Sequence, residues 1–277
     1  MSKKLVTLTI LLVVVISACS SPNQAPDSGM PNEANQPQSQ GAPVIVAEWD
    51  VEPAEQASIA AGEDGSVYSV TNLLHVVHYS AAGQFLAGWD LPGEVSAVAV
   101  GSNGEVFSVN NMLHIVHYSA VGQVLAEWDA PGEVSALAVS PNGEVFSVNN
   151  MLHIVHYNMV GEVVAEWESD GEVSAIAVGP GGEVFSVNNM LRIVHYSASG
   201  QVLAEWDTDG EVSAITVSPA GNVFSFNNML HIVKYSAEGQ VLGELDLEAQ
   251  ALAIAASPIG EALVNVNNSH RIVIYDF

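Results

Sequence analysis

Apolar residues in this chain fall in short runs, and the same series of runs recurs about every 39 residues. In the unit that spans residues 131–168, four such runs are separated by Gly, Pro and Asn. Val, Ile, Phe, Tyr and Trp fill the runs, and these residues are typical of β-strands. No run reaches the ~10 residues that a normal helix needs. The unit is therefore predicted to hold four strands, at Val134–Val139, Glu144–Val148, Leu152–Tyr157 and Glu162–Trp167.

Aromatic residues mark the repeat along most of the chain. The Trp positions are Trp49, Trp89, Trp128, Trp167 and Trp206. The Tyr positions are Tyr79, Tyr118, Tyr157, Tyr196, Tyr235 and Tyr275. A unit of about 40 residues fits one four-stranded propeller blade, and also some helical repeats. The recurring Gly, Pro and Asn exclude helical repeats, because they would break each helix. The fold class is therefore all-β, a β-propeller.

The two ends of the repeat region complete each other. The last unit has only three runs, at Ala251–Ala256, Ala262–Val266 and Arg271–Tyr275. The missing fourth run lies at the other end, where Val44–Asp50 matches Val124–Asp129. A blade shared between the termini closes the ring and removes its exposed strand edges. Residues 44–277 are thus predicted to form a six-bladed β-propeller of four-stranded blades, the last blade closed by the N-terminal strand.

The N-terminus has the pattern of an export signal. Lys3 and Lys4 precede an apolar run, Leu5–Ile16, that is shorter than the roughly 20 residues of a membrane-spanning helix. Residues 16–19 resemble the lipobox of bacterial lipoproteins, which implies cleavage after residue 18 and lipidation of Cys19, the only cysteine. The alternative is an ordinary signal peptide with a chance Cys. Residues 1–18 are predicted to be the signal and residues 19–43 a disordered tether. The predicted location is the bacterial cell envelope, lipid-anchored and extracytoplasmic.

The charge balance limits the partners. There are 31 Asp and Glu against 5 Lys and Arg, a formal net charge of −26. Such a surface repels nucleic acid and anionic lipid head groups, and it favours cations or basic partners. The same charge is also compatible with simple solubility of a tethered surface protein.

The units resemble NHL-type propeller repeats, and more loosely the gluconolactonase and streptogramin-lyase propellers. The motifs lie at Ala136–Phe146, Ile154–Tyr157 and Gly161–Trp167. The connection at Asn149–Leu152 departs from the family, where a longer loop contains Asp. The resemblance leaves two functions open. One is a binding or scaffold module. The other is a lactonase-like or lyase-like enzyme with a divalent metal in the central channel.

A ring of glutamates is the first candidate site. Glu55, Glu94, Glu133, Glu172 and Glu211 share one repeat position, just before the first strand of each blade. Because the first strand of a propeller blade lies innermost, these residues should surround one mouth of the channel. Carboxylates suit Ca²⁺, but ligands must lie within about 2.6 Å of the ion. A solvated ring too wide to share one ion is the other interpretation. No other cofactor is expected.

Histidines recur at two positions of the third strand. The first position holds His75, His114, His153, Arg192, His231 and Arg271. The second holds His78, His117, His156, His195, Lys234 and Ile274. Zinc is not expected, because Arg and Lys are not zinc ligands and replace His within both sets. Both positions are predicted to make polar contacts between blades, with Ser69, Ser108, Ser147, Ser186 and Ser225 as partners.

Amides and carboxylates are expected together on one face. The amides are Asn111, Asn150, Asn189 and Asn228, and the carboxylates on the connections between blades include Asp90, Asp129 and Asp207. Met112, Met151, Met190 and Met229 lie beside the amides. Surface Met can adapt to varied partners, whereas Asn commonly satisfies turn backbones, and both interpretations stay open.

Catalysis finds little support in the sequence. No Gly-x-Ser-x-Gly motif and no Gly-rich phosphate loop occur. An active site needs different residues in different roles, whereas each candidate position here is repeated nearly unchanged. The sequence therefore favours a monomeric binding or scaffold module, with a protein or polycationic envelope ligand as its partner.

Overall fold

Strands make up all the secondary structure of the described residues. The computed structural model describes residues 14–15, 43–51, 56–62, 64–71, 75–93, 95–101, 103–228, 230–248, 250–256, 263–267 and 271–276. Cys19 and nearly all of the predicted signal and tether lie outside these residues. In the described part of the chain, no helix is long and apolar enough to cross a membrane.

The strands take four places in their sheets, from the central channel to the rim. The innermost strands are β3 (Gln56–Ala61), β7 (Val95–Val100), β11 (Val134–Val139), β15 (Val173–Val178), β19 (Val212–Val217) and β23 (Ala251–Ala256). The second strands are β4 (Val67–Thr71), β8 (Val106–Asn110), β12 (Val145–Asn149), β16 (Val184–Asn188), β20 (Val223–Asn227) and β24 (Leu263–Asn267). The third strands are β5 (His75–Tyr79), β9 (His114–Tyr118), β13 (His153–Tyr157), β17 (Arg192–Tyr196), β21 (His231–Tyr235) and β25 (Arg271–Asp276). The outermost strands are β2 (Val44–Asp50), β6 (Phe85–Asp90), β10 (Val124–Asp129), β14 (Val163–Glu168), β18 (Val202–Asp207) and β22 (Val241–Asp246).

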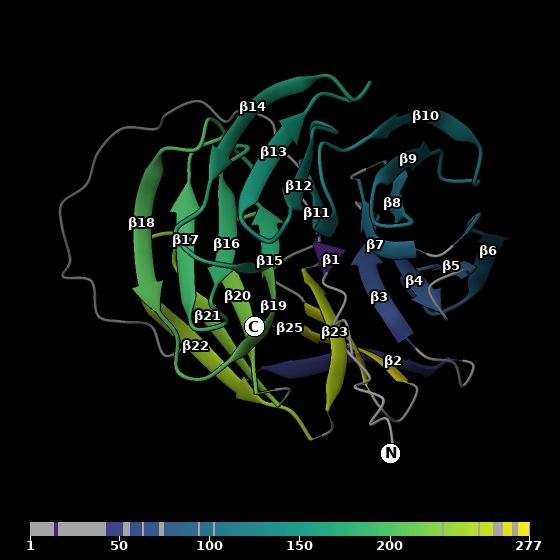
Figure 1. Ribbon diagram of the computed structural model, residues 1–277. Coiled ribbons are helices and arrows are strands. Elements are labelled where there is room, and N and C mark those ends of the chain that lie inside the picture. The colour runs from purple at the N-terminus through teal and green to yellow at the C-terminus, as the bar shows by residue number, and fades with distance from the viewer. Residues whose placement is uncertain are drawn as a thin grey trace, which may run out of the picture.

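The strands form antiparallel sheets arranged as the blades of a propeller (Figure 1). Five of the sheets have four strands each. In the remaining sheet, β11–β14 are joined by the short strand β1 (Val14–Val15), which pairs in parallel with β11. The prediction of six four-stranded blades therefore holds in full for five sheets, and β1 makes the other sheet five-stranded.

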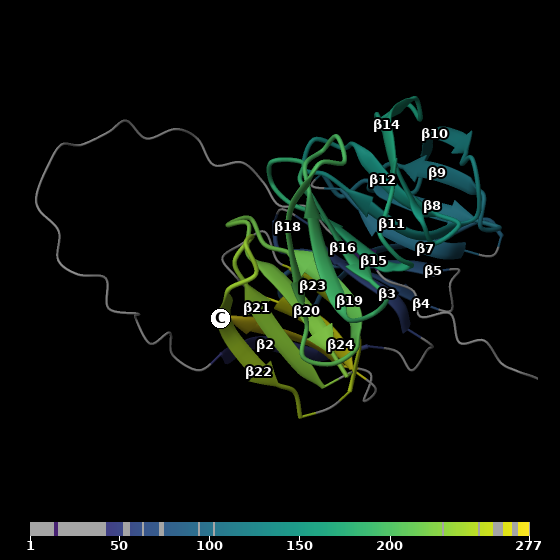
Figure 2. The ribbon, with the colours of Figure 1, turned by 60° about the vertical axis from the view of Figure 1, so that its left-hand side comes forward.

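The innermost strands form a closed ring around the channel. Each of them lies beside the next along the chain, and β23 lies beside β3. Figure 2 shows the sheet of β7–β10 and the sheet of β19–β22 on opposite sides of the ring. The short β1 lies near the centre, in contact with the innermost strands.

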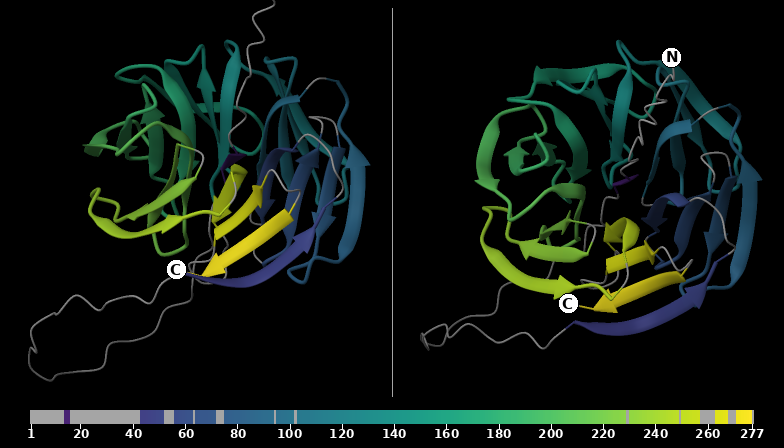
Figure 3. Two further views of the ribbon diagram at one scale, coloured as in Figure 1. Left: turned by 90° about the horizontal axis from the view of Figure 1, so that it is seen from below. Right: turned by 60° about the horizontal axis from the view of Figure 1, so that its bottom comes forward.

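The chain ends are joined in one sheet, as the sequence predicts. Strand β2 pairs antiparallel with β25, from Val44 opposite Asp276 to Asp50 opposite Arg271. Figure 3 shows the dark blue β2 running beside the yellow β25 at the rim. The prediction that Val44–Asp50 supplies the missing fourth strand is confirmed.

Burial along the strands explains their composition. Strands β11 and β12 are buried along almost their whole length, because neighbouring sheets cover both of their faces. The outermost β14 alternates between exposed and half-buried residues, with Ala165 and Trp167 turned inward. The core thus lies between adjacent blades.

Trp packing joins neighbouring blades at the rim. Trp128 of β10 lies at 5.8 Å from Tyr157 of the next blade, measured between ring centroids. Above it lies Gly161, in a turn with φ +84°, where an added Cβ would come within 2.5 Å of the indole ring. Gly122, Gly200 and Gly239 approach Trp89, Trp167 and Trp206 in the same way. These close approaches explain why Trp and Gly recur together in the repeat.

Some strands start one residue later than predicted. Strand β12 begins at Val145, because Glu144 closes the preceding turn. The amide N–H of Ser140 donates to the carbonyl O of Glu144 at 2.8 Å, and the amide N–H of Glu144 donates to the Ser140 hydroxyl at 3.0 Å. A similar turn precedes β14, which begins at Val163, and in it the amide N–H of Asn158 donates to the carbonyl O of Glu162 at 2.9 Å. Strand β13 begins at His153, after a different turn in which the amide N–H of Leu152 donates to the carbonyl O of Asn149.

Candidate functional site

Two connections meet on one face of the ring, which we call the crossover face. One is the turn between the second and third strands of a blade, and we call these turns the Asn–Met turns where they hold the pairs Asn111–Met112, Asn150–Met151 and Asn189–Met190. The other is the crossover that leads from the outermost strand of one blade to the innermost strand of the next. Because the strands of a sheet are antiparallel, the two remaining turns of each blade lie on the opposite face.

The Asn–Met turns have a left-handed backbone at two successive residues. Asn150 has φ 51° and Met151 has φ 60°, and the amide N–H of Leu152 donates to the carbonyl O of Asn149 at 3.2 Å. Positive φ at both central residues of a turn closed by this hydrogen bond is typical of a type I′ turn, and the pairing of Asn149 with His153 leaves three residues in the hairpin loop. The turns at Asn111–Met112 and Asn189–Met190 have nearly the same angles.

Backbone hydrogen bonds tie each Asn–Met turn to the crossover beside it. The carbonyl O of Leu152 accepts from the amide of Ser169 at 2.8 Å, and that of Met151 accepts from the amide of Val173 at 2.7 Å. The equivalent bonds from Val134 to Met112 and from Val212 to Met190 measure 2.6 and 2.7 Å. Each turn therefore positions the first residue of the next blade.

Three of the five predicted ring glutamates lie within the described residues. Glu133, Glu172 and Glu211 are exposed and come directly before the innermost strands β11, β15 and β19. The other two, Glu55 and Glu94, lie outside the described residues. The described residues contain no group of three His, Cys, Asp or Glu side chains arranged to hold a metal ion. Both interpretations of the ring, a Ca²⁺ site and a solvated ring too wide to share one ion, stay untested.

The second Asn of each turn, which the sequence singled out, is exposed and supports the backbone. Asn150 Oδ1 accepts from the amide of Glu133 at 3.2 Å, and Asn189 Oδ1 accepts from the amide of Glu172 at 3.2 Å. Asn111 and Asn228 adopt the same positive φ. These contacts agree with the interpretation in which Asn satisfies turn backbones.

The first Asn of each pair is the residue that sequence reasoning missed. Asn188 is fully buried at the end of β16, where its Nδ2 donates to the carbonyl O of Asp170 at 2.9 Å. Its Oδ1 accepts from the Ser186 hydroxyl at 2.5 Å. Asn227, Ser225 and Asp209 repeat this arrangement. The available signal was that Asn recurs at this position in five of the six units, with Thr71 in the first, almost as regularly as at the next position.

The aspartates expected on the connections between blades are instead the last residues of the outermost strands β6, β10 and β18, and they pair with the first His position of the third strand. His75 Nδ1 lies 2.6 Å from Asp90, and His114 Nδ1 lies 2.8 Å from Asp129. Arg192 Nε lies 3.5 Å from Asp207. The hydrogen bond to Asp129 raises the pKa of His114. The prediction that this His position joins neighbouring blades is wrong, because each pair lies on adjacent strands of one sheet.

These aspartates remain open to solvent despite their partners. The carboxylate side chains of Asp90, Asp129 and Asp207 are 87, 83 and 86% exposed. A salt bridge so exposed contributes little to stability. The carboxylates of these aspartates can therefore be reached by a molecule that approaches the crossover face.

The second His position is buried against aromatic rings. His117 stacks on Phe107 at 4.1 Å between ring centroids, and His195 stacks on Phe185 at 4.2 Å. His195 Nδ1 donates to the carbonyl O of Ala237 at 3.0 Å, which confirms a polar contact with the next blade. Burial lowers the pKa of His195.

The predicted partnership between this His and the Ser of the second strand is wrong. The hydroxyl of Ser186 donates to Asn188 instead, and that of Ser108 donates to Asn110 at 2.6 Å. His117 Nε2 lies 3.2 Å from a carboxylate oxygen of Glu105. The geometry of this contact is not that of an aligned hydrogen bond, because Nε2 finds no acceptor in good geometry.

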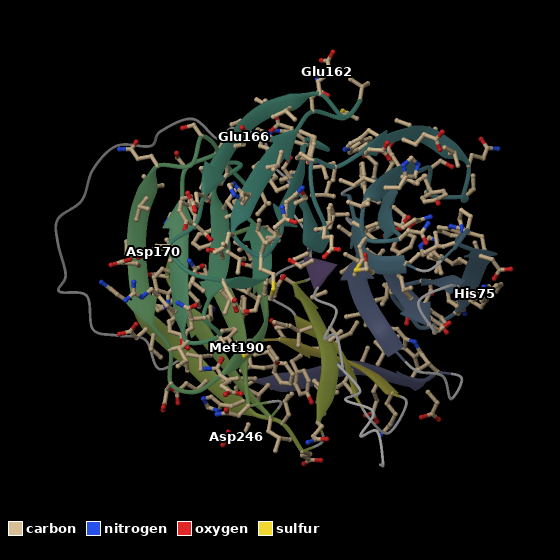
Figure 4. The ribbon with its side chains drawn as sticks, in the orientation of Figure 1. His75, Glu162, Glu166, Asp170, Met190 and Asp246 are labelled. Carbon is tan, nitrogen blue, oxygen red and sulfur yellow. The ribbon has the colours of Figure 1, made fainter. Side chains whose placement is uncertain are left out.

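A hollow of about 340 Å³ opens on the opposite face. It is lined by Asn142, Glu144, Asn158, Met159 and Val160. In Figure 4, Glu162 lies at the outer tip of the same blade, whereas Met190 lies nearer the centre of the ring. The hollow is lined by the turns β11–β12 and β13–β14, which lie on the face opposite the crossovers, so it is separate from the crossover face.

Comparison with known families gives one match. The sequence model described as Tectonin domain matches residues 55–251, which is more than half of the chain. The predicted resemblance to NHL-type repeats is not confirmed by this match. No curated protein is similar enough to the chain to count as a relative.

Proposed function

Because the chain belongs to the Tectonin domain family, a propeller family, we propose that it is a binding or scaffold module whose crossover face docks a basic protein partner. A propeller fold suits such a role, and propeller domains commonly bind proteins. The proposal concerns the face used and the charge of the partner.

The observation that carries the proposal is the repeated display of carboxylates around one face. Glu133, Glu172 and Glu211 are exposed beside the innermost strands, and Asp129 and Asp207 are exposed at the outer ends of the crossovers. With a net charge of −26, the molecule attracts basic partners and repels acidic ones. Near-identical sites on successive blades suit an extended or repeating partner, because each blade adds a further contact.

Binding of polylysine tests the proposal directly. The double variant Glu133→Gln/Glu172→Gln removes two charges from the crossover face. The control Glu162→Gln/Glu238→Gln removes two exposed charges from turns on the opposite face. Both variants have the same net charge, so any difference reports the position of the charges.

The crossover-face variant should bind polylysine more weakly than the control at low salt. The difference should shrink as salt rises, since exposed charges are screened over about 10 Å at 0.1 M. Calorimetric titration at several salt concentrations measures both effects. Equal affinity of the two variants at every salt concentration would reject this face as the docking site.

We also propose that the module is anchored outside the cytoplasm through lipid on Cys19. The support is the lipobox-like sequence and the single cysteine of the chain. If residues 1–18 are cleaved, β1 leaves with them, and the mature ring has six four-stranded blades. Cys19→Ser should release the protein from the membrane fraction of its host, and retention of the variant there would contradict the lipid anchor.

A further inference from the structure

The Asn–Met turns display large apolar side chains on the crossover face. In the three of these turns that the structure describes throughout, the Met is followed by a Leu, and both are exposed. The exposed fractions are 43% for Met112, 45% for Leu113, 45% for Met151, 36% for Leu152, 50% for Met190 and 49% for Leu191. Apolar side chains that recur at one place on the surface indicate an interaction site when they gather in this way.

The hydrogen bonds that hold the Asn–Met turns in place do not use the Met side chains. Met151 has φ 60°, a left-handed conformation that is unfavourable for a residue with a long side chain. Glycine adopts this conformation without strain and is the usual residue at the second position of a type I′ turn. The contact with the next blade uses the carbonyl O of Met151, which glycine would also supply. The side chain is thus retained at a cost in backbone energy, and the turn itself gives no reason for it.

Acidic residues flank each apolar pair. The carbonyl O of Met151 accepts from Val173, so Glu172 lies directly beside this turn. The carbonyl O of Leu152 accepts from Ser169, which places Glu168 at its other side. Met190 is next to Glu211 in the same way, through the amide of Val212. Beside the Met151 and Met190 turns, the crossover face therefore alternates between apolar and acidic surface.

We propose that this face binds cationic amphipathic polypeptide segments, in which Lys or Arg alternates with apolar residues. The proposal rests on the proposed function and specifies the partner: the cations meet the carboxylates, and the apolar residues cover the Met and Leu side chains. A purely cationic chain leaves the apolar pairs in water. A second copy of this protein would bring two surfaces of the same charge together. Flexible Met side chains suit varied apolar partners.

Two synthetic peptides of equal length and charge provide the test. One consists of Lys and Leu placed on opposite faces of a helix, and the other has Ser in place of each Leu. The full chain should bind the Lys–Leu peptide at least about tenfold more tightly than the Lys–Ser peptide, because the apolar contact adds to the charge attraction. Calorimetry at a fixed salt concentration measures both affinities.

The triple variant Met112→Gly/Met151→Gly/Met190→Gly should lose most of this preference and still bind the Lys–Ser peptide as before. Its melting temperature should be equal or higher, because glycine relieves the strained backbone. If the glycine variant does not fold, the triple Met→Gln variant replaces it. This variant keeps the length of the side chains but makes them polar, so it should also lose the preference for the Lys–Leu peptide. The control Val121→Ser/Val160→Ser removes apolar side chains exposed by 69 and 66% on the opposite face and should keep the preference.

The possible results separate this inference from the proposed function. Equal affinity for both peptides overturns the inference and leaves the acidic docking face intact. Binding of neither peptide overturns both proposals. If the Val121→Ser/Val160→Ser control loses the preference and the Met variants keep it, the apolar contact lies on the opposite face and the inference is overturned. Binding to neutral phosphatidylcholine vesicles that the Met variants abolish, without a preference between the peptides, would identify a lipid surface as the occupant instead.

Discussion

Replacing Gly161 by Ala tests how closely neighbouring blades are packed at the rim. The new methyl group would come within 2.5–2.8 Å of three atoms of the Trp128 ring, and the backbone has φ +84°. Two costs therefore combine, one from the left-handed backbone and one from the crowded indole. Gly221 separates them, because it has φ +81° in an equivalent turn but nothing within 4 Å of its added Cβ.

The two costs can be estimated separately. A left-handed backbone costs a residue with a Cβ ~1–2 kcal/mol. Overpacking adds ~1–3 kcal/mol where the neighbours cannot move away. Gly221→Ala should therefore lower the free energy of unfolding by the first amount alone, and Gly161→Ala by the sum. At ~2–4 °C per kcal/mol for a domain of this size, the melting temperatures of the two variants should differ by about 2–12 °C.

Thermal melts and urea titrations followed by far-UV circular dichroism measure the difference without relying on Trp fluorescence. A double-mutant cycle with Trp128→Leu assigns its cause, because in that background the effect of Gly161→Ala should fall to that of Gly221→Ala. Equal destabilisation by the two Ala substitutions in the natural background would refute the view that Trp128 restricts this turn.

Three further predictions concern closure, buried histidine and the buried amides. Deleting residues 44–50 should sharply lower the melting temperature and promote aggregation, because it exposes the edge of β25; calorimetry with light scattering checks this, and an unchanged melting temperature would contradict it. Burial holds the pKa of His195 below its usual 6.5, so the unfolded state binds more protons and stability should fall as the pH drops below 6.5. His195→Gln, which does not titrate, should flatten urea midpoints measured between pH 7 and 5, and an unchanged slope would count against the argument. Asn188→Ala leaves the buried Ser186 hydroxyl and the carbonyl O of Asp170 without this partner and should cost ~1–3 kcal/mol, clearly more than Asn189→Gly at the exposed neighbour, as measured by urea titration.

The sequence predicts the strands well because the repeat supplies several views of one pattern. Apolar alternation and turn residues locate β11 at Val134–Val139 without error, and the matching ends identify the pairing of β2 with β25. Errors of one residue occur where a turn takes up the first residue of an expected strand. The hydroxyl and the amide of Ser140 bind the backbone of Glu144, so Glu144 belongs to the turn and β12 begins after it. Strand propensity indicates which residues suit a strand, but the residue at which the strand begins depends on the hydrogen bonds of the turn before it.

The contacts of the polar residues were harder to predict. Ser147 and His156 both recur and both point to buried positions, so a hydrogen bond between them was reasonable from spacing. The sheet instead places Ser147 beside Asn149, two residues along the same strand and on the same side. His156 stacks on Phe146 of the adjacent strand at 4.2 Å. The repeat identifies the recurring polar positions but not their hydrogen-bond partners. Four of the blades have the same Ser and His at the same spacing, so comparing blades does not reveal which residue each one contacts.

The crossover face separates the roles of backbone and side chain. At Met151 the carbonyl O holds the next blade, and the partly exposed side chain takes no part in that bond. At Asn188 the reverse is true, since the side chain is buried and supplies the hydrogen bonds that fix the crossover. Both the Met and the Asn recur from blade to blade. The repeat alone therefore does not tell a residue that holds the fold together from a residue that binds a partner. Hydrogen bonds add what recurrence lacks: Asn150 and Met151 are both exposed with positive φ, but only the Asn side chain bonds to the crossover, so the Met side chain is the better candidate for a contact outside the molecule.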